Sequence, residues 1–171
     1  MTRLILLVCM ALQAVACSTY RAGYDYVPRP LDVAFTEQTR VLLTVPGVRR
    51  AEKGVRSDAV EVVLQVDHAG PGTWILRPEG LTLTGGNLVA FEAAETEPAE
   101  GLQLASGESG KLVAYFVIPG RDGAARADLE GLNLRMTADI DGKQVTQSAT
   151  FMQRQHHRDG GGFRFGVHVG M

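Results

Sequence analysis

Apolar and polar residues alternate along most of the chain after residue 30, and this period of two predicts β-strands. In the clearest run, from Val60 to Val66, every second residue is aliphatic and most residues between them are polar. This is the pattern of a strand with one face in a core and one in solvent. The run Leu112 to Ile118 is apolar on both faces, which predicts a central strand. Further strand-like runs lie at 31–35, 41–45, 73–76, 81–84, 88–92, 132–140 and 145–151.

Segments rich in Gly, Pro, Asp and Ser separate these runs and predict tight turns. They lie at 69–72, 78–80, 85–87, 106–110 and 119–123. Asp141-Gly142 joins two strand-like runs, and this dipeptide favours the type I′ turn of a β-hairpin. The run 93–99 holds helix formers, but its acidic residues and Pro98 favour an exposed loop or a single turn. Seven to nine strands of this kind predict an all-β, immunoglobulin-like antiparallel β-sandwich, with a small β-barrel as the alternative.

The first sixteen residues differ from the rest and predict a signal peptide. Arg3 is their only charge, and the thirteen residues from Leu4 to Ala16 are apolar except for Gln13. Thirteen residues are too few to span a bilayer, which takes about 20 in a helix. A positive start, a short apolar stretch and small residues at its end are typical of a secretory signal.

Ala14-Val15-Ala16-Cys17 resembles the lipobox of bacterial lipoproteins. The resemblance implies that Cys17 carries covalent lipid, becomes the mature N-terminus and anchors the protein to a membrane. The residue after the cysteine is Ser18 and not Asp. The absence of Asp at this position resembles the sorting pattern for the outer rather than the inner membrane, with the protein facing the periplasm. The alternative is cleavage by ordinary signal peptidase after Ala-Val-Ala, which would leave Cys17 free.

The chain then divides into four parts: a signal peptide over 1–16, a lipidated N-terminus and tether over 17–30, a β-sandwich domain over 31–152, and a basic, His- and Gly-rich segment over 153–171. The tyrosines of 17–30 lie among polar residues, and they fit a tether, the lipid interface or the first strand. In the last part, residues 163–169 alternate apolar and polar. They predict either the last strand of the sheet or an extension that adds to a partner's sheet edge.

Charge gives no case for nucleic acid as a partner. The chain holds 17 Lys and Arg against 19 Asp and Glu, and removal of Arg3 with the signal peptide makes the mature chain slightly more acidic. A nucleic-acid-binding domain needs a clustered basic face. The 20 glycines among 171 residues instead supply the many turns of a β protein.

The strand and turn motifs of residues 40–152 together are similar to bacterial exported immunoglobulin-like domains of unknown function. The motifs are the strands at 62–66 and 74–76, then the Gly-rich turn 106–111 that leads into Leu112 to Pro119. The resemblance implies a fold and an extracytoplasmic setting. It transfers no functional residues.

Motifs for catalysis or cofactors are incomplete in this chain. Gly107 to Lys111 lacks the first Gly and the final Ser or Thr of a phosphate-binding loop, and Asp139 to Gly142 lacks the later ligands of a calcium loop. No Gly-x-Ser-x-Gly nucleophile motif occurs. We therefore expect no catalytic residues and no cofactor besides the lipid on Cys17. Weak candidates for metal ligation are His156, His157 and His168.

These observations predict a lipid-anchored, non-catalytic binding or accessory module of the cell envelope that contacts other envelope proteins. The alternative is a periplasmic carrier of a metal or small molecule, which would use the C-terminal histidines or a cavity between the sheets.

Overall fold

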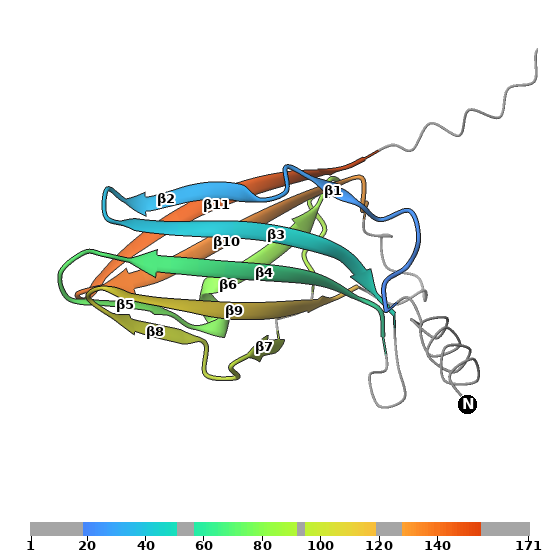
Figure 1. Cartoon of the computed structure of the whole chain (residues 1–171). Coiled ribbons are helices and arrows are strands. Elements are labelled where there is room, and N and C mark those ends of the chain that lie inside the picture. The colour runs from blue at the N-terminus through green and yellow to red at the C-terminus, as the bar shows by residue number, and fades with distance from the viewer. Residues whose placement is uncertain (1–18, 51–56, 92–94, 119–127, 155–171) are drawn as a thin grey trace, which may run out of the picture.

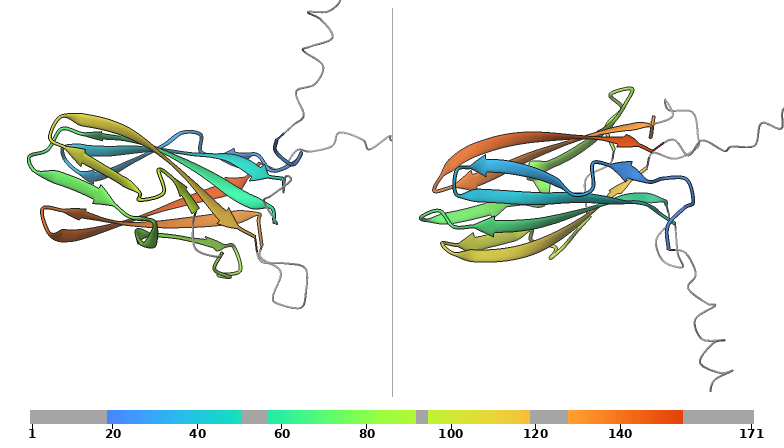
Figure 2. Two further views of the ribbon diagram at one scale, coloured as in Figure 1. Left: turned by 90° about the horizontal axis from the view of Figure 1, so that it is seen from below. Right: turned by 45° about the horizontal axis from the view of Figure 1, so that its top comes forward.

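The computed structural model describes residues 19–50, 57–91, 95–118 and 128–154. In these residues the chain forms two antiparallel β-sheets that pack face to face (Figures 1 and 2). Sheet A has the strand order β2-β3-β4-β9-β7, and sheet B has the order β1-β11-β10-β5-β8, with β6 also paired to β10. The antiparallel β-sandwich is thereby confirmed, and the small barrel is not the fold adopted.

The strands of sheet A are β2 (Leu31–Thr36), β3 (Thr39–Arg49), β4 (Ala59–His68), β7 (Glu95–Glu97) and β9 (Glu108–Val117). Those of sheet B are β1 (Tyr26–Val27), β5 (Thr73–Leu76), β6 (Leu81–Gly85), β8 (Leu102–Ala105), β10 (Gly131–Ile140) and β11 (Lys143–Gln153). A short 3-10 turn, η1 (Pro78–Gly80), separates β5 from β6.

Most predicted strands are confirmed, and β9 lies inside sheet A between β4 and β7 as a central strand should. The strand predicted at 88–92 is wrong. There Leu88 has a φ of 62°, and among the described residues of this run Ala90 forms an isolated bridge to Thr84. The strands β1, β7 and β8 were not predicted: each has two to four residues, and none has three consecutive apolar residues as the equally short β5 does. β7 lies in the run 93–99, for which the exposed loop or single turn predicted from the sequence is wrong. These three strands bring the described strands to eleven, above the predicted seven to nine.

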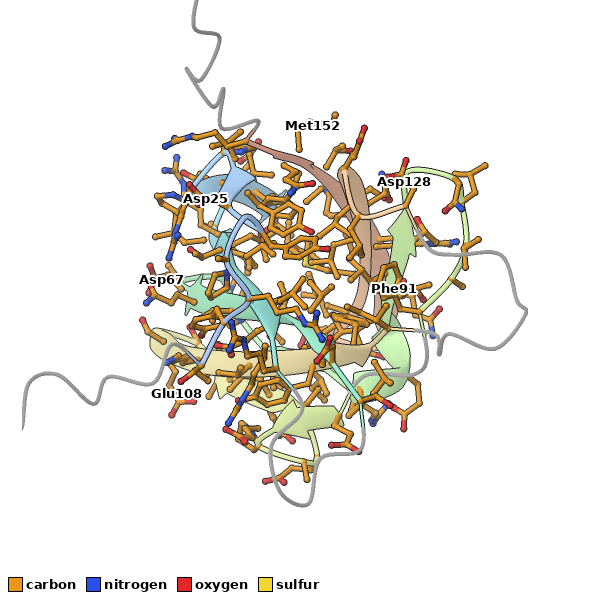
Figure 3. The ribbon with its side chains drawn as sticks, turned by 90° about the vertical axis from the view of Figure 1, so that its right-hand side faces the viewer. Asp25, Asp67, Phe91, Glu108, Asp128 and Met152 are labelled. Carbon is orange, nitrogen blue, oxygen red and sulfur yellow. The ribbon has the colours of Figure 1, made fainter. Side chains whose placement is uncertain are left out.

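The alternating aliphatic residues of both sheets point inward and form one core (Figure 3). Val62 and Leu64 of β4 are fully buried, as are Leu134 and Met136 of β10. Trp74 is also fully buried, and its ring meets that of Phe35 edge-on with centroids 5.8 Å apart. The other fully or almost fully buried side chains include Tyr26, Val41, Leu43, Leu76, Leu83, Leu112, Phe116, Leu132 and Phe151.

The hairpin predicted at Asp141-Gly142 is confirmed. Ile140 pairs with Lys143, so the loop has two residues, and both have positive φ, 51° and 78°. These are the signs of φ that a type I′ turn requires. The Asp139 carboxylate accepts a hydrogen bond from the Gly142 amide at 2.7 Å. Asp139 thus stabilises a turn. This agrees with the sequence, in which Asp139 to Gly142 lacks the later ligands of a calcium loop.

The segment predicted as a tether is part of the folded domain from Thr19 onward, which corrects the boundary at residue 31. Tyr26 and Val27 form β1 and pair with Gln153 and Met152 of β11. Tyr26 is fully buried, and its hydroxyl donates a hydrogen bond to the Leu129 carbonyl at 3.0 Å. The polar residues around Tyr26 favour a solvated segment, but a tyrosine buries about 150–250 Å², and the free energy of this burial holds the segment against the domain.

The two ends of the described chain lie at the same end of the sandwich (Figure 1). The Arg154 amide donates to the Asp25 carbonyl at 2.6 Å, and the Arg50 amide donates to the Thr19 carbonyl at 3.0 Å. Within the described ranges, no helix has the length and hydropathy needed to cross a membrane.

Candidate interaction face

The residues predicted to carry chemistry lie outside the described residues. Cys17 precedes the described chain by two positions, and His156, His157 and His168 follow it. In the ranges that the structure covers, no three His, Cys, Asp or Glu side chains gather as a metal site would require. The lipid anchor and the C-terminal histidines therefore remain predictions.

His68 is described, and its surroundings are those of a core residue. It ends β4 with 2% of its surface exposed, and its Nδ1 lies 2.8 Å from the Oγ1 of Thr39, which is also buried. The second ring nitrogen, Nε2, has no hydrogen-bond partner in the structure. His68 therefore links β3 to β4 at the end of the sandwich opposite residues 19 and 154, the two ends of the described chain (Figure 1).

The segment that follows Cys17 docks on the last residues of β3. The Arg21 amide donates to the Val48 carbonyl at 2.8 Å, and Tyr20 forms an antiparallel bridge with Arg49. A glycine permits the close approach: a Cβ on Gly47 would lie 2.8 Å from the Tyr24 carbonyl oxygen and 3.6 Å from Tyr20 Cδ1. The first described residues thus pair with the last part of β3, which β2 does not reach.

An aromatic and ionic cluster covers the outer side of sheet A at this end; we call Tyr20, Arg49, Glu61, Glu97 and Tyr115 the anchor-side cluster. The Arg49 guanidinium lies 5.2 Å from the centre of the Tyr115 ring, a cation–π distance. Burial, together with a hydrogen bond to the Glu61 carboxylate and its charge, raises the pKa of Tyr20 to about 12. Burial and then the charges of Glu61 and Glu97 also raise the pKa of Tyr115.

Beyond the cluster, the outer side of sheet A is aliphatic. Leu42, Val63 and Val113 lie on adjacent strands, point away from the core and are partly exposed. Val63 is the Cα partner of Thr44 on one side and of Val113 on the other. We call Leu42, Val63 and Val113 the apolar strip; Thr44 lies within it on β3.

The far end of the same side is charged. Asp32, Arg40, Asp67 and Lys111 are exposed there, one on each of the four strands β2, β3, β4 and β9. Arg40 and Asp32 form an exposed ion pair with 3.4 Å between nitrogen and oxygen, and such pairs contribute about 0–1 kcal/mol. Figure 3 shows Asp67 on the outer side of its sheet. The anchor-side cluster, the apolar strip and this charged end together form what we call the sheet A face.

The outer side of sheet B has a different chemistry. Its central strands carry mostly hydroxyl and amide side chains with one guanidinium: Thr82, Thr84, Asn133, Arg135, Thr137, Thr146, Ser148 and Thr150. Met152, opposite Val27 of β1, is an exposed apolar residue at one end of this side. Several of the polar side chains bond to one another. Asn133 donates to the Thr150 hydroxyl at 3.1 Å, and the Thr137 and Thr146 hydroxyls lie 3.0 Å apart. The middle of the outer side of sheet B, around Ser148, is therefore polar where sheet A carries the apolar strip.

Of the apolar strip, the sequence pattern singles out Val113 alone, as part of the second apolar face of the run Leu112 to Ile118. On β9, Val113 and Tyr115 lie opposite the core residues, and the two apolar faces of this run predict a central strand without deciding what covers the second face. The structure places them on the outer side of sheet A, partly exposed. The signal that could have identified the strip is Val63, an aliphatic residue between Glu61 and Gln65 on the otherwise polar face of its strand.

Comparisons with known proteins add little. No family model matches the chain, and no curated protein matches it. Among solved structures, the chain is similar to the yjhA protein from Bacillus subtilis, with 15% sequence identity over 66% of this chain and 76% of that chain and a TM-score of 0.36.

Proposed function

We propose that this protein is a lipid-anchored, non-catalytic binding module of the bacterial cell envelope that contacts envelope proteins through its sheet A face. The observation that carries the proposal is the apolar strip: Val63 and Val113 are register partners, Leu42 is the diagonal neighbour of Val63 on β3, and all three are partly exposed. Contiguous exposed aliphatic side chains rimmed by polar ones are typical of protein interaction sites.

The proposed anchor determines how this face is presented. Lipid on Cys17 would be two residues from Thr19, whose carbonyl bonds to Arg50 at the end of β3. Two residues span at most about 7 Å, so this end of the sandwich is held at the bilayer surface. Strands of ten residues are about 33 Å long, so the turns at the opposite end reach into the periplasm from the outer membrane.

Several lipid chains make the attachment stable. Each buried CH₂ contributes about 0.8 kcal/mol, and one chain holds only marginally whereas two or more anchor firmly. Mass spectrometry of the N-terminus measures the modification directly. We expect acylated Cys17 in wild type and release of the Cys17→Ala variant from membranes. An unmodified Cys17 at the N-terminus would overturn the anchor.

Site-specific photo-crosslinking in the intact envelope tests the binding face. A photo-reactive side chain in place of Val63 is expected to give a crosslinked protein of defined mass. The same side chain in place of Ser148, on the outer side of sheet B, is the control and is expected to give none. Equal crosslinking at both positions, or none at Val63, would refute the assignment of this face.

A further inference from the structure

The charges on the sheet A face follow the strand register in two rows. One row crosses the sheet as Asp32, Leu42, Gln65 and Lys111, and the next as Ala34, Arg40, Asp67 and Ser109, each residue being the Cα partner of the one before. In the first row an acid and a base lie at opposite ends. In the second a base and an acid lie on the two middle strands.

The charges of two copies of this face complement each other for one position of a two-fold axis. A two-fold axis that runs along the strands between β3 and β4 exchanges β3 with β4 and β2 with β9. When two copies face each other across it, Asp32 opposes Lys111 of the second copy, and Arg40 opposes the second copy's Asp67. Both rows then pair opposite charges, which is the complementarity that selects partners at interfaces.

Two neighbouring positions of the axis do not pair opposite charges in either row. An axis on β4 places Lys111 opposite Leu42 and Arg40 opposite Ser109. An axis between β4 and β9 places Lys111 opposite Gln65 and Asp67 opposite Ser109. Because two-fold contacts are isologous, each residue pair occurs twice, so the charge pattern distinguishes clearly between these positions.

We propose that the partner which fits the sheet A face is a second copy of this chain, anchored in the same membrane and related by a two-fold axis between β3 and β4. This proposal rests on the proposed function, since it names the occupant of the same face. An axis along the strands keeps both anchored ends at one level, as two lipid anchors in one bilayer require. It also brings Val63 opposite Thr44 of the second copy, inside the apolar strip.

The available area fits a weak dimer. Three strands about 33 Å long and the six-residue β2, about 20 Å long, spaced about 4.8 Å apart, outline roughly 600 Å² of flat sheet in each copy. Two copies therefore bury about 1,200 Å², the lower limit of stable interfaces. Confinement of both copies to one membrane raises their effective concentration and compensates for this modest area.

The test is a charge exchange measured on the full lipidated chain in phospholipid vesicles, with dimerisation followed by energy transfer between labelled copies. We expect Asp32→Lys and Lys111→Asp each to weaken dimerisation about tenfold, and the double variant to recover to within about threefold of wild type. Within one copy these residues are three strand spacings apart, about 14 Å, so recovery arises only between copies. Lys143→Asp, at the exposed β10–β11 turn, is the control and is expected to change nothing.

The outcomes separate this inference from the proposed function. A wild-type protein that stays monomeric in vesicles, or a double variant no better than the single ones, overturns the two-fold dimer. If position 63 still crosslinks to a different envelope protein in that case, the binding face stands and only the identity of its partner is wrong. If position 63 gives no crosslink above the Ser148 control, both proposals fail.

Discussion

Replacement of Tyr26 tests whether the segment after the anchor is part of the domain or a tether. Its side chain is fully buried, and its hydroxyl donates to the Leu129 carbonyl at 3.0 Å. Tyr26→Ala removes both the ring and the hydrogen bond. Tyr26→Phe keeps the ring and removes only the hydrogen bond.

The expected magnitudes follow from burial. A tyrosine that buries about 150–250 Å² at about 25 cal/mol per Å² contributes roughly 4–6 kcal/mol, an upper limit because the unfolded chain already buries some of it. Large-to-Ala changes in cores cost about 3–5 kcal/mol. We therefore expect Tyr26→Ala to lower the free energy of unfolding by about 4 kcal/mol and Tyr26→Phe by about 1 kcal/mol.

Urea unfolding of the soluble chain that begins at Ser18 measures these differences. Met152→Ala is a matched control, because Met152 lies on β11 opposite Val27 of the same strand pair but is 55% exposed. It is expected to cost well under the Tyr26→Ala value. If Tyr26→Ala costs less than about 1 kcal/mol, below the range for a buried ring, residues 19–27 do not belong to the folded domain and the reasoning fails.

Three further predictions concern the backbone and the tyrosines. Gly47→Ala is expected to destabilise by roughly 1–3 kcal/mol in urea unfolding, because the new Cβ would lie 2.8 Å from the Tyr24 carbonyl oxygen. Leu88→Gly is expected to stabilise by roughly 0.5–1 kcal/mol in the same assay, since it relieves a φ of 62° on a side chain that is 82% exposed. Burial and Glu61 raise the pKa of Tyr20 from 10 to about 12 in the folded protein. The contribution of the neutral Tyr20 side chain to the free energy of unfolding is therefore complete below pH 10 and is lost as the pH rises from 10 through 12. Thermal unfolding across this range should show a steeper loss for wild type than for Tyr20→Phe, and equal slopes would contradict the assignment.

The parts of the fold that depend on neighbouring residues were predictable. Alternation over Val60 to Val66 specifies a strand, because successive side chains of an extended chain point to opposite faces. Asp141-Gly142 specifies a hairpin, because few residues tolerate two consecutive positive φ values. Each is a local property of the backbone, and the structure has both.

The failures have non-local causes. Leu88 to Glu92 has the composition of a strand, yet Phe91 is buried in the core from a segment whose backbone turns at Leu88. Tyr26 lies among polar residues and two prolines, yet it is buried because β11 supplies its partner from more than 120 positions further along the chain. No window of sequence contains both sides of such a contact.

By itself, then, the sequence determined that the protein is an all-β sandwich and where most of its strands and its tightest hairpin lie. It also determined that Val63, Val113 and Leu42 are apolar, without deciding whether they face the core. Only the tertiary structure decided that they lie together on the outer side of sheet A, in register with two rows of charge. The physical reason is that alternation distinguishes two faces of a strand, whereas which face is covered depends on the pairing of strands that are distant in the chain.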